Sequence, residues 1–83
     1  MKFSSSADAQ RARALEALRT GPKTSYDLRR LGLYQAPARI LELRRAGYLI
    51  ETHPVTVVDA DGYEHPGVAL YTLVEEPSPE EAT

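Results

Sequence analysis

The chain contains no cysteine. Neither a disulfide framework nor a thiolate zinc site can stabilise it, so its core must be built from Leu, Ile, Val and Tyr. It also lacks an apolar run near the roughly 20 residues that a bilayer-spanning helix needs. The first residues pass into SSSADAQ without the apolar segment of a secretion signal. These absences predict a cytoplasmic protein that does not enter a membrane.

Signatures of catalysis are missing as well. No nucleophile with a suitable base, no glycine-rich phosphate loop and no paired carboxylates can be assembled from the sequence. His53 and His65, with Asp59 and Asp61 nearby, do not have zinc-ligand spacing. A chain of 83 residues forms one small domain, and such a domain buries only about 60% of its unfolded surface. We therefore expect surface binding, with no enzymatic activity, metal or cofactor.

No Lys or Arg follows Arg45. From residue 8 to 46, nine basic residues stand against four acidic ones, a balance of +5. Residues 47–74 contain four acidic and no basic residues, and residues 75–83 add four glutamates. The overall charge of −2 therefore conceals a basic first half and an acidic second half. This division predicts that only the first half contacts nucleic-acid phosphates.

Apolar spacing and capping residues predict three helices in the basic half. The first is expected over Ala7–Arg19 and ends at Gly21-Pro22, because proline cannot continue the hydrogen-bond ladder. Thr24 or Ser25 can cap the second helix, and Gly32 is the expected left-handed stop. Two leucines of this second helix are expected to face the core, namely Leu28 and Leu31.

The third helix is expected from about Gln35 to Ala46, with Pro37 in its first turn, where the missing N–H is not needed. Residues spaced by four and three form its buried stripe: Ala36, Ile40 and Leu43. Arg44 lies near this stripe, so we expect it to cover the core and bind a carboxylate or a backbone carbonyl. Together with the second helix, this segment has the outline of a helix-turn-helix.

The acidic half predicts a β-hairpin. Strand-like runs occupy residues 48–52 and 55–58, residues 59–67 are turn-rich, and residues 68–74 form the return strand. Alternation in this last strand does not decide which face is buried, although we favour Tyr71 and Leu73 toward the helices. The acidic segment 75–83 has no large apolar residue and is expected to be a disordered tail. Residues 1–6 are expected to be a flexible lead-in.

Three segments, QRARALEAL, TSYDLRRLGL and ARILELRRAGY, precede the predicted hairpin. Together they resemble the helix-turn-helix domain of many small phage and prophage proteins, in its winged-helix form. The resemblance covers about Gln10 to Leu73, and its most specific part is Ala38–Gly47. It implies an α+β fold over residues 7–74, in which three helices are followed by a hairpin wing. It also implies binding of double-stranded DNA for phage or prophage gene regulation.

A groove-reading helix needs side chains that can bond base edges. With Ile40 at the centre of the buried face and about 100° per residue, Arg39 lies at the margin of the outward face. Arginine pairs with guanine and glutamine with adenine, whereas a glutamate more commonly orients a neighbouring arginine. We therefore expect base contacts from the third helix, at Gln35, Ala38, Arg39, Glu42 and Arg45.

Phosphate contacts are expected from the region around the second helix, where capping and pairing with the helix dipole are the structural alternatives. The candidates are Lys23, Thr24, Ser25 and Arg29. Residues 59–65 lack the Lys or Arg with which a wing grips the minor groove. The wing is thus expected to avoid DNA or to meet a protein.

Two kinds of protein contact remain open. One winged helix buries only roughly 600–1,000 Å² on DNA, so a homodimer or a partner subunit is expected for specificity. Winged helices also serve as protein-binding modules. The alternative function is therefore an interaction module without DNA binding, in which the acidic wing and tail bind a host or phage protein.

Overall fold

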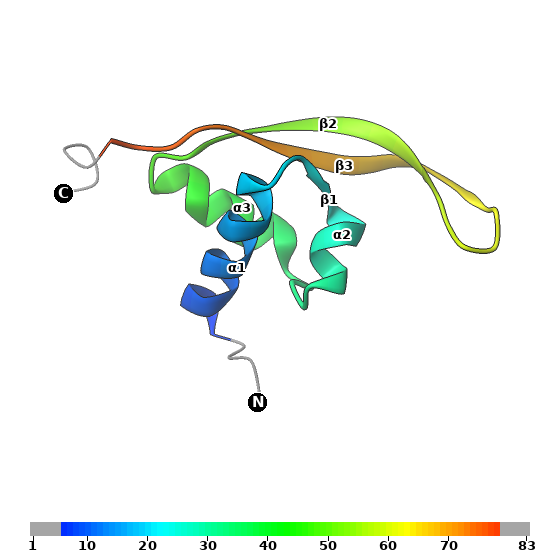
Figure 1. The fold of residues 1–83 in the computed structure, drawn as a ribbon, viewed down its shortest axis with the longest axis horizontal. Helices are drawn as coiled ribbons and strands as arrows, with labels where there is room; N and C mark the ends of the chain where they lie inside the picture. The colour runs from blue at the N-terminus through cyan, green and yellow to red at the C-terminus, as the bar shows by residue number, and fades with distance from the viewer. Residues whose placement is uncertain (1–5, 79–83) are drawn as a thin grey trace.

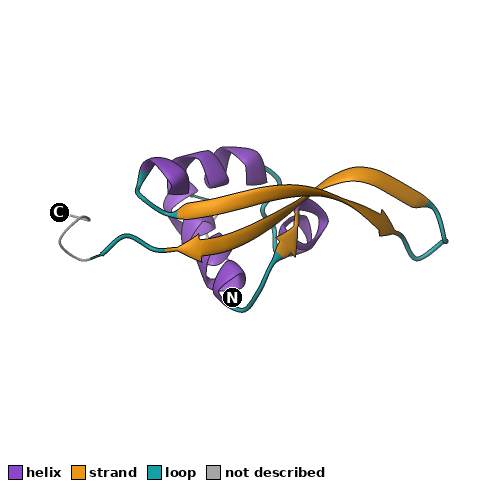
Figure 2. Cartoon of the chain, turned by 90° about the horizontal axis from the view of Figure 1, so that it is seen from above, coloured by secondary structure: helices purple, strands orange, loops and turns teal. Residues whose placement is uncertain are grey.

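The computed structural model describes residues 6–78 and places three helices against one face of a three-stranded antiparallel sheet (Figures 1 and 2). The sheet order is β1-β3-β2. The β2–β3 hairpin extends beyond the helical body (Figure 1). In chain order the elements are α1 (Ala7–Arg19), β1 (Lys23–Thr24), α2 (Ser25–Arg30), α3 (Ala36–Arg45), β2 (Leu49–Val58) and β3 (Glu64–Glu75).

The predicted helix boundaries agree with the structure within about one residue. Ser6 caps α1 by accepting a hydrogen bond of 3.2 Å from the backbone N–H of Ala9. A capping box starts α2, where the Thr24 hydroxyl accepts from the N–H of Asp27 at 3.0 Å. In return, the Asp27 carboxylate accepts from the N–H of Thr24 at 2.9 Å. These caps satisfy amides that have no partner within the helix.

The turn between α2 and α3 is closed by Gly32 in a left-handed conformation, with φ of +88°. Its N–H donates to the carbonyl of Arg29 at 2.9 Å, and the N–H of Leu33 donates to the carbonyl of Leu28 at 3.0 Å. These two hydrogen bonds are those of a Schellman motif, a common helix end in which the residue after the glycine also makes an apolar contact with the helix. Leu33 supplies that contact and is almost fully buried.

Substitution of Gly32 by alanine is expected to destabilise the domain by about 1–2 kcal/mol, because a Cβ atom disfavours the left-handed conformation. The nearest atom to an added Cβ is the Arg13 Nη2 at 4.0 Å, so the cost arises from the backbone and not from a clash. Urea unfolding measures the loss. Gly32→Asn should lose less, because asparagine tolerates this conformation. Equal stability of Gly32→Ala and the parent chain would contradict this account of the turn.

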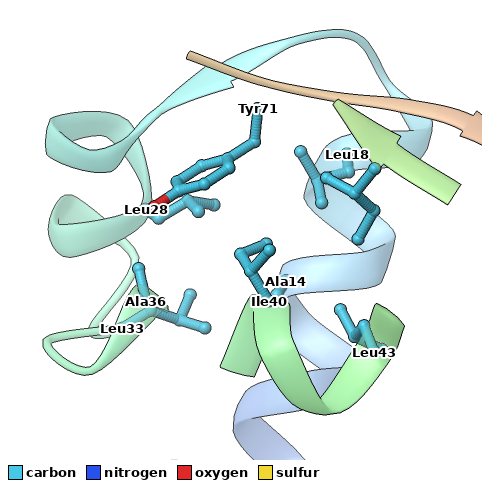
Figure 3. Close-up of a cluster of buried hydrophobic side chains, with 9 residues drawn as sticks. Ala14, Leu18, Leu28, Leu33, Ala36, Ile40, Leu43 and Tyr71 are labelled. Carbon is cyan, nitrogen blue, oxygen red and sulfur yellow. The ribbon is translucent and has the colours of Figure 1, made fainter. Parts of the chain in front are cut away.

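The core lies between the helices and the sheet (Figure 3). Its largest fully buried side chains are Leu28, Leu33 and Ile40. Tyr71 points from β3 into this cluster and Leu73 packs against it, as the sequence favoured. Leu31 does not face inward as expected, since 47% of it is exposed. The chain turns at Gly32, and Leu33 occupies the inner position instead.

The sheet is larger than the sequence predicted. The two-residue strand β1 was not predicted, because Lys23 and Thr24 pair with Tyr71 and Leu70, which are distant in sequence. Strand β2 continues through Pro54, which it can accommodate because β2 is an edge strand. Strand β3 begins at Glu64, so the expected long turn is reduced to residues 59–63.

The C-terminal boundary also requires correction, because the acidic tail was expected to begin at residue 75. Glu75 belongs to β3, and the Glu76 carboxylate accepts from the Arg19 guanidinium at 2.6 Å. A Cβ added at Gly47 would lie 3.1 Å from Pro77, which places this proline against the end of α3. Residues 79–83 of the expected tail and residues 1–5 of the expected lead-in lie outside the described residues. None of the helices in residues 6–78 is long and apolar enough to cross a bilayer.

Candidate nucleic-acid interface

The outward face of α3 is opposite the side buried by Ala36, Ile40 and Leu43. Arg45 lies on this outward face, is exposed, and has no hydrogen-bond or ion-pair partner within residues 6–78. Gln35 is exposed just before the helix, and its side chain does not cap it. Ala38 is half-buried between them. Of the five predicted base-contacting residues, Gln35, Ala38 and Arg45 therefore lie on the outward side of α3 or directly before it.

Arg39 and Glu42 are turned toward α1 instead. Arg39 Nε lies 2.9 Å from Glu42 Oε1, and only 15% of the Arg39 side chain is exposed. The same carboxylate accepts from Arg11 of α1 at 2.8 Å. Arg39, which was expected at the margin of the outward face, is therefore not free to project outward, because α1 packs on this flank of α3. The expectation that Glu42 orients a neighbouring arginine is confirmed for Arg39.

The two arginines lower the pKa of the Glu42 carboxyl. The hydrogen bond from Arg11 is the main cause, and the positive charges of Arg39 and Arg11 add to it, while partial desolvation opposes them. The pKa of Arg11 is raised by the same hydrogen bond. The contact therefore favours a charged carboxylate and a charged guanidinium, which joins α1 to α3 beside the outward face.

In a pH titration followed by NMR, the Glu42 carboxyl is expected to titrate below the usual glutamate pKa of about 4.3. Because the folded pKa is lowered, its stabilising contribution is present above that usual pKa and is lost as pH falls through the lowered value. Arg11→Met should move the Glu42 pKa back upward. Glu42→Gln should remove this component of the acid dependence of unfolding. A Glu42 pKa at or above the usual value would refute the contact.

The residues proposed for phosphate contacts lie around α2 and differ in their availability. Lys23 Nζ donates to the Thr20 hydroxyl at 3.0 Å and to the Gly21 carbonyl at 3.3 Å. Thr24 is engaged in the capping box, and Ser25 is half-buried as the first residue of α2. Arg29 is exposed, and its guanidinium lies 5.6 Å from the centroid of the Tyr34 ring. Arg29 is thus the most accessible of the four.

Tyr34 is a residue that the sequence prediction missed. Its side chain is 72% exposed in the turn directly before α3, where the Arg29 guanidinium stacks on it. The sequence did contain a signal for an exposed Tyr34. This aromatic residue lies between the glycine expected to be left-handed and the start of the third helix, outside the buried stripe. This pair places a positive charge and an exposed aromatic ring in the segment directly before α3.

Arg44 connects α3 to the sheet. Its guanidinium donates to the Ile50 carbonyl at 3.0 and 2.7 Å and to the Thr52 hydroxyl at 2.6 Å. The expected bond to a backbone carbonyl is confirmed. Because Ile50 and Thr52 belong to β2, Arg44 fixes the wing relative to α3.

The tip of the wing is organised by Asp59. One carboxylate oxygen accepts from the N–H groups of Asp61 and Tyr63, each at 2.9 Å. The other lies 2.8 Å from His65 Nε2, and this bond is the main cause of a lowered Asp59 pKa. Tyr63 at the tip is 70% exposed. Within residues 6–78, no group of three or more His, Cys, Asp or Glu side chains is arranged to hold a metal ion.

Charge is divided between the two parts of the described structure. Four exposed arginines of α2 and α3 have no carboxylate partner within residues 6–78, namely Arg29, Arg30, Arg44 and Arg45. The β2–β3 wing contains no Lys or Arg; its charged side chains are carboxylates, and it also contains two histidines. Such a surface attracts a polyanion to α2 and α3 and repels it from the wing.

A comparison with models of protein families matches most of the chain. The family model described as a winged helix-turn-helix domain matches residues 9–76. Neither the comparison with curated proteins nor that with solved structures gives a match. The matched segment includes α1 from its third residue, all of α2 and α3, and the whole β2–β3 wing.

Proposed function

Because the chain belongs to the winged helix-turn-helix family, a family of DNA-binding domains, we propose that it binds double-stranded DNA with α3 in the major groove. In this proposal it is a small transcriptional regulator of phage or prophage type and not an enzyme. The observation that carries the proposal is Arg45, an exposed arginine without a partner in residues 6–78, on the outward face of the helix that follows the turn. The phage assignment is supported by the sequence resemblance.

The proposed contacts follow from this placement. Arg45 offers paired donors to guanine, and Gln35 offers a donor and an acceptor to adenine. Arg39 and Glu42 act as positioning residues, because their ion pairs hold the flank of α3 against α1. Phosphate contacts come from Arg29, with Lys23, Thr24 and Ser25 beside it.

We propose that contacts with other proteins are made by the wing. Its acidic side chains repel phosphate, and its tip exposes Tyr63 together with Val58, which is 59% exposed. A second copy of the chain or a host or phage protein with a basic surface fits such a tip. This contact is separate from the α3 interface: the chain alone binds DNA through α3, and a partner held at the tip only enlarges the total interface with DNA.

Fluorescence anisotropy with labelled random-sequence duplexes tests the proposal. Affinity should fall steeply with salt, with a slope of about −0.9 in log–log form for each phosphate that is neutralised. Replacing two acidic wing residues, Asp61→Ala with Glu64→Ala, should leave affinity unchanged or raise it. Absence of duplex binding at low salt, or its loss in the wing variant, would refute the proposal and favour the protein-interaction alternative.

A further inference from the structure

The middle of the outward face of α3 is apolar. Three residues at helical spacing form this part, which we call the α3 ridge: Pro37, Ala38 and Leu41. Leu41 is 46% exposed, although its neighbour Ile40 is almost fully buried. Gln35 lies before the ridge and Arg45 lies one turn after Leu41. The side chains of the α3 ridge, which lie between these two polar residues, therefore cannot form hydrogen bonds.

Cations lie at both ends of the ridge. Arg29, stacked on Tyr34, stands before α3, and Arg45 is the last residue of the helix. A ten-residue helix is about 15 Å long, and the major groove is about 12 Å wide. A duplex lying across α3 would thus present its two phosphate backbones near the cations and the groove floor to the ridge. This charge complementarity favours DNA as the occupant.

The groove floor offers one apolar group that such a ridge can recognise. The C5-methyl group of thymine is exposed in the major groove, and small or apolar side chains contact it. We propose that the α3 ridge reads thymine methyl groups, with Leu41 and Ala38 as the contacting residues, beside a guanine bound by Arg45. This inference rests on the proposed function and deepens it by naming the base class.

Replacement of thymine by deoxyuridine removes only the methyl group and keeps base pairing. A preferred duplex is first selected from a random library with the full chain, and its thymines are then replaced one at a time. At the positions read by the ridge, the parent protein should lose about fourfold in affinity for each methyl group removed. Leu41→Ala should bind the thymine duplex more weakly and show no further loss when deoxyuridine replaces the thymine that Leu41 contacts, while sensitivity at a thymine contacted by Ala38 remains.

The matched control is Val74→Ala, which truncates an apolar side chain of β3 that is 51% exposed and lies outside α3 and the wing tip, and it should keep full sensitivity to deoxyuridine. Circular dichroism shows whether both variants are folded. Equal affinity for the thymine and deoxyuridine duplexes would overturn thymine reading while DNA binding stands. Absence of any duplex binding would overturn both proposals. A dimer in solution that Leu41→Ala dissociates would show that a second copy covers the ridge and would also overturn thymine reading.

Discussion

Arg45→Ala is expected to weaken binding of the preferred duplex by about 1–3 kcal/mol, which is roughly 5- to 150-fold. The side chain is exposed at the end of α3 and contributes no ion pair within residues 6–78. Its removal should therefore change DNA affinity and not the free energy of unfolding. Arg45→Lys retains the charge but not the paired donors, so it should bind with reduced sequence preference.

Arg19→Ala provides the matched control for this experiment. Arg19 is also a partly exposed arginine near a helix end, but it lies on α1 and pairs with Glu76. Its loss should leave duplex affinity within about twofold of the parent, since one screened surface pair has little effect on the fold. Similar affinity losses from both substitutions would indicate that only net charge matters, which would contradict a specific role for Arg45.

Ile40→Ala is expected to cost about 2–5 kcal/mol of the free energy of unfolding, because it removes a fully buried side chain and leaves a cavity. Ile40 contributes to the contact between α3 and the rest of the core (Figure 3). Small domains are stable by about 5–15 kcal/mol in total. The substitution should therefore bring the domain close to unfolding at ordinary temperatures, as measured by urea denaturation.

The adjacent residue supplies the comparison. Leu41→Ala alters an exposed side chain of similar size and should change the free energy of unfolding by no more than about 0.5 kcal/mol. The two variants together test which face of α3 is buried. Equal losses from Ile40→Ala and Leu41→Ala would show that the helix is oriented differently from the structure.

The helices could be predicted because their signals are local. Ser6, Thr24 and Gly32 cap or end helices through atoms within a few residues of the chain, and the apolar spacing of α3 defines its buried face. The acidity of the wing could be read from composition, and its two strands could be read from strand-like runs on either side of a turn-rich segment. Its full length was not, because the extra pairs of β3 depend on register across the hairpin and not on strand propensity.

The parts that could not be predicted depend on tertiary packing. Strand β1 exists only because β3 offers it a partner. Arg39 lies at the margin of the outward face in sequence terms, and the position of α1 decides that it turns inward to Glu42. The stacking of Arg29 on Tyr34 likewise depends on how the turn folds. Helical periodicity identifies the candidate helix, whereas the packing of α1 decides which arginines remain available.

The central claim is that duplex DNA binds the outward face of α3 and not the wing. Backbone amide chemical shifts, recorded by NMR while the selected duplex is added to the full chain, test it most directly. We predict that the shifts change from Tyr34 through Arg45 and at Arg29, while those of residues 58–64 at the wing tip stay nearly constant. Changes confined to the wing tip, or an absence of changes at α3 under low salt, would contradict the claim.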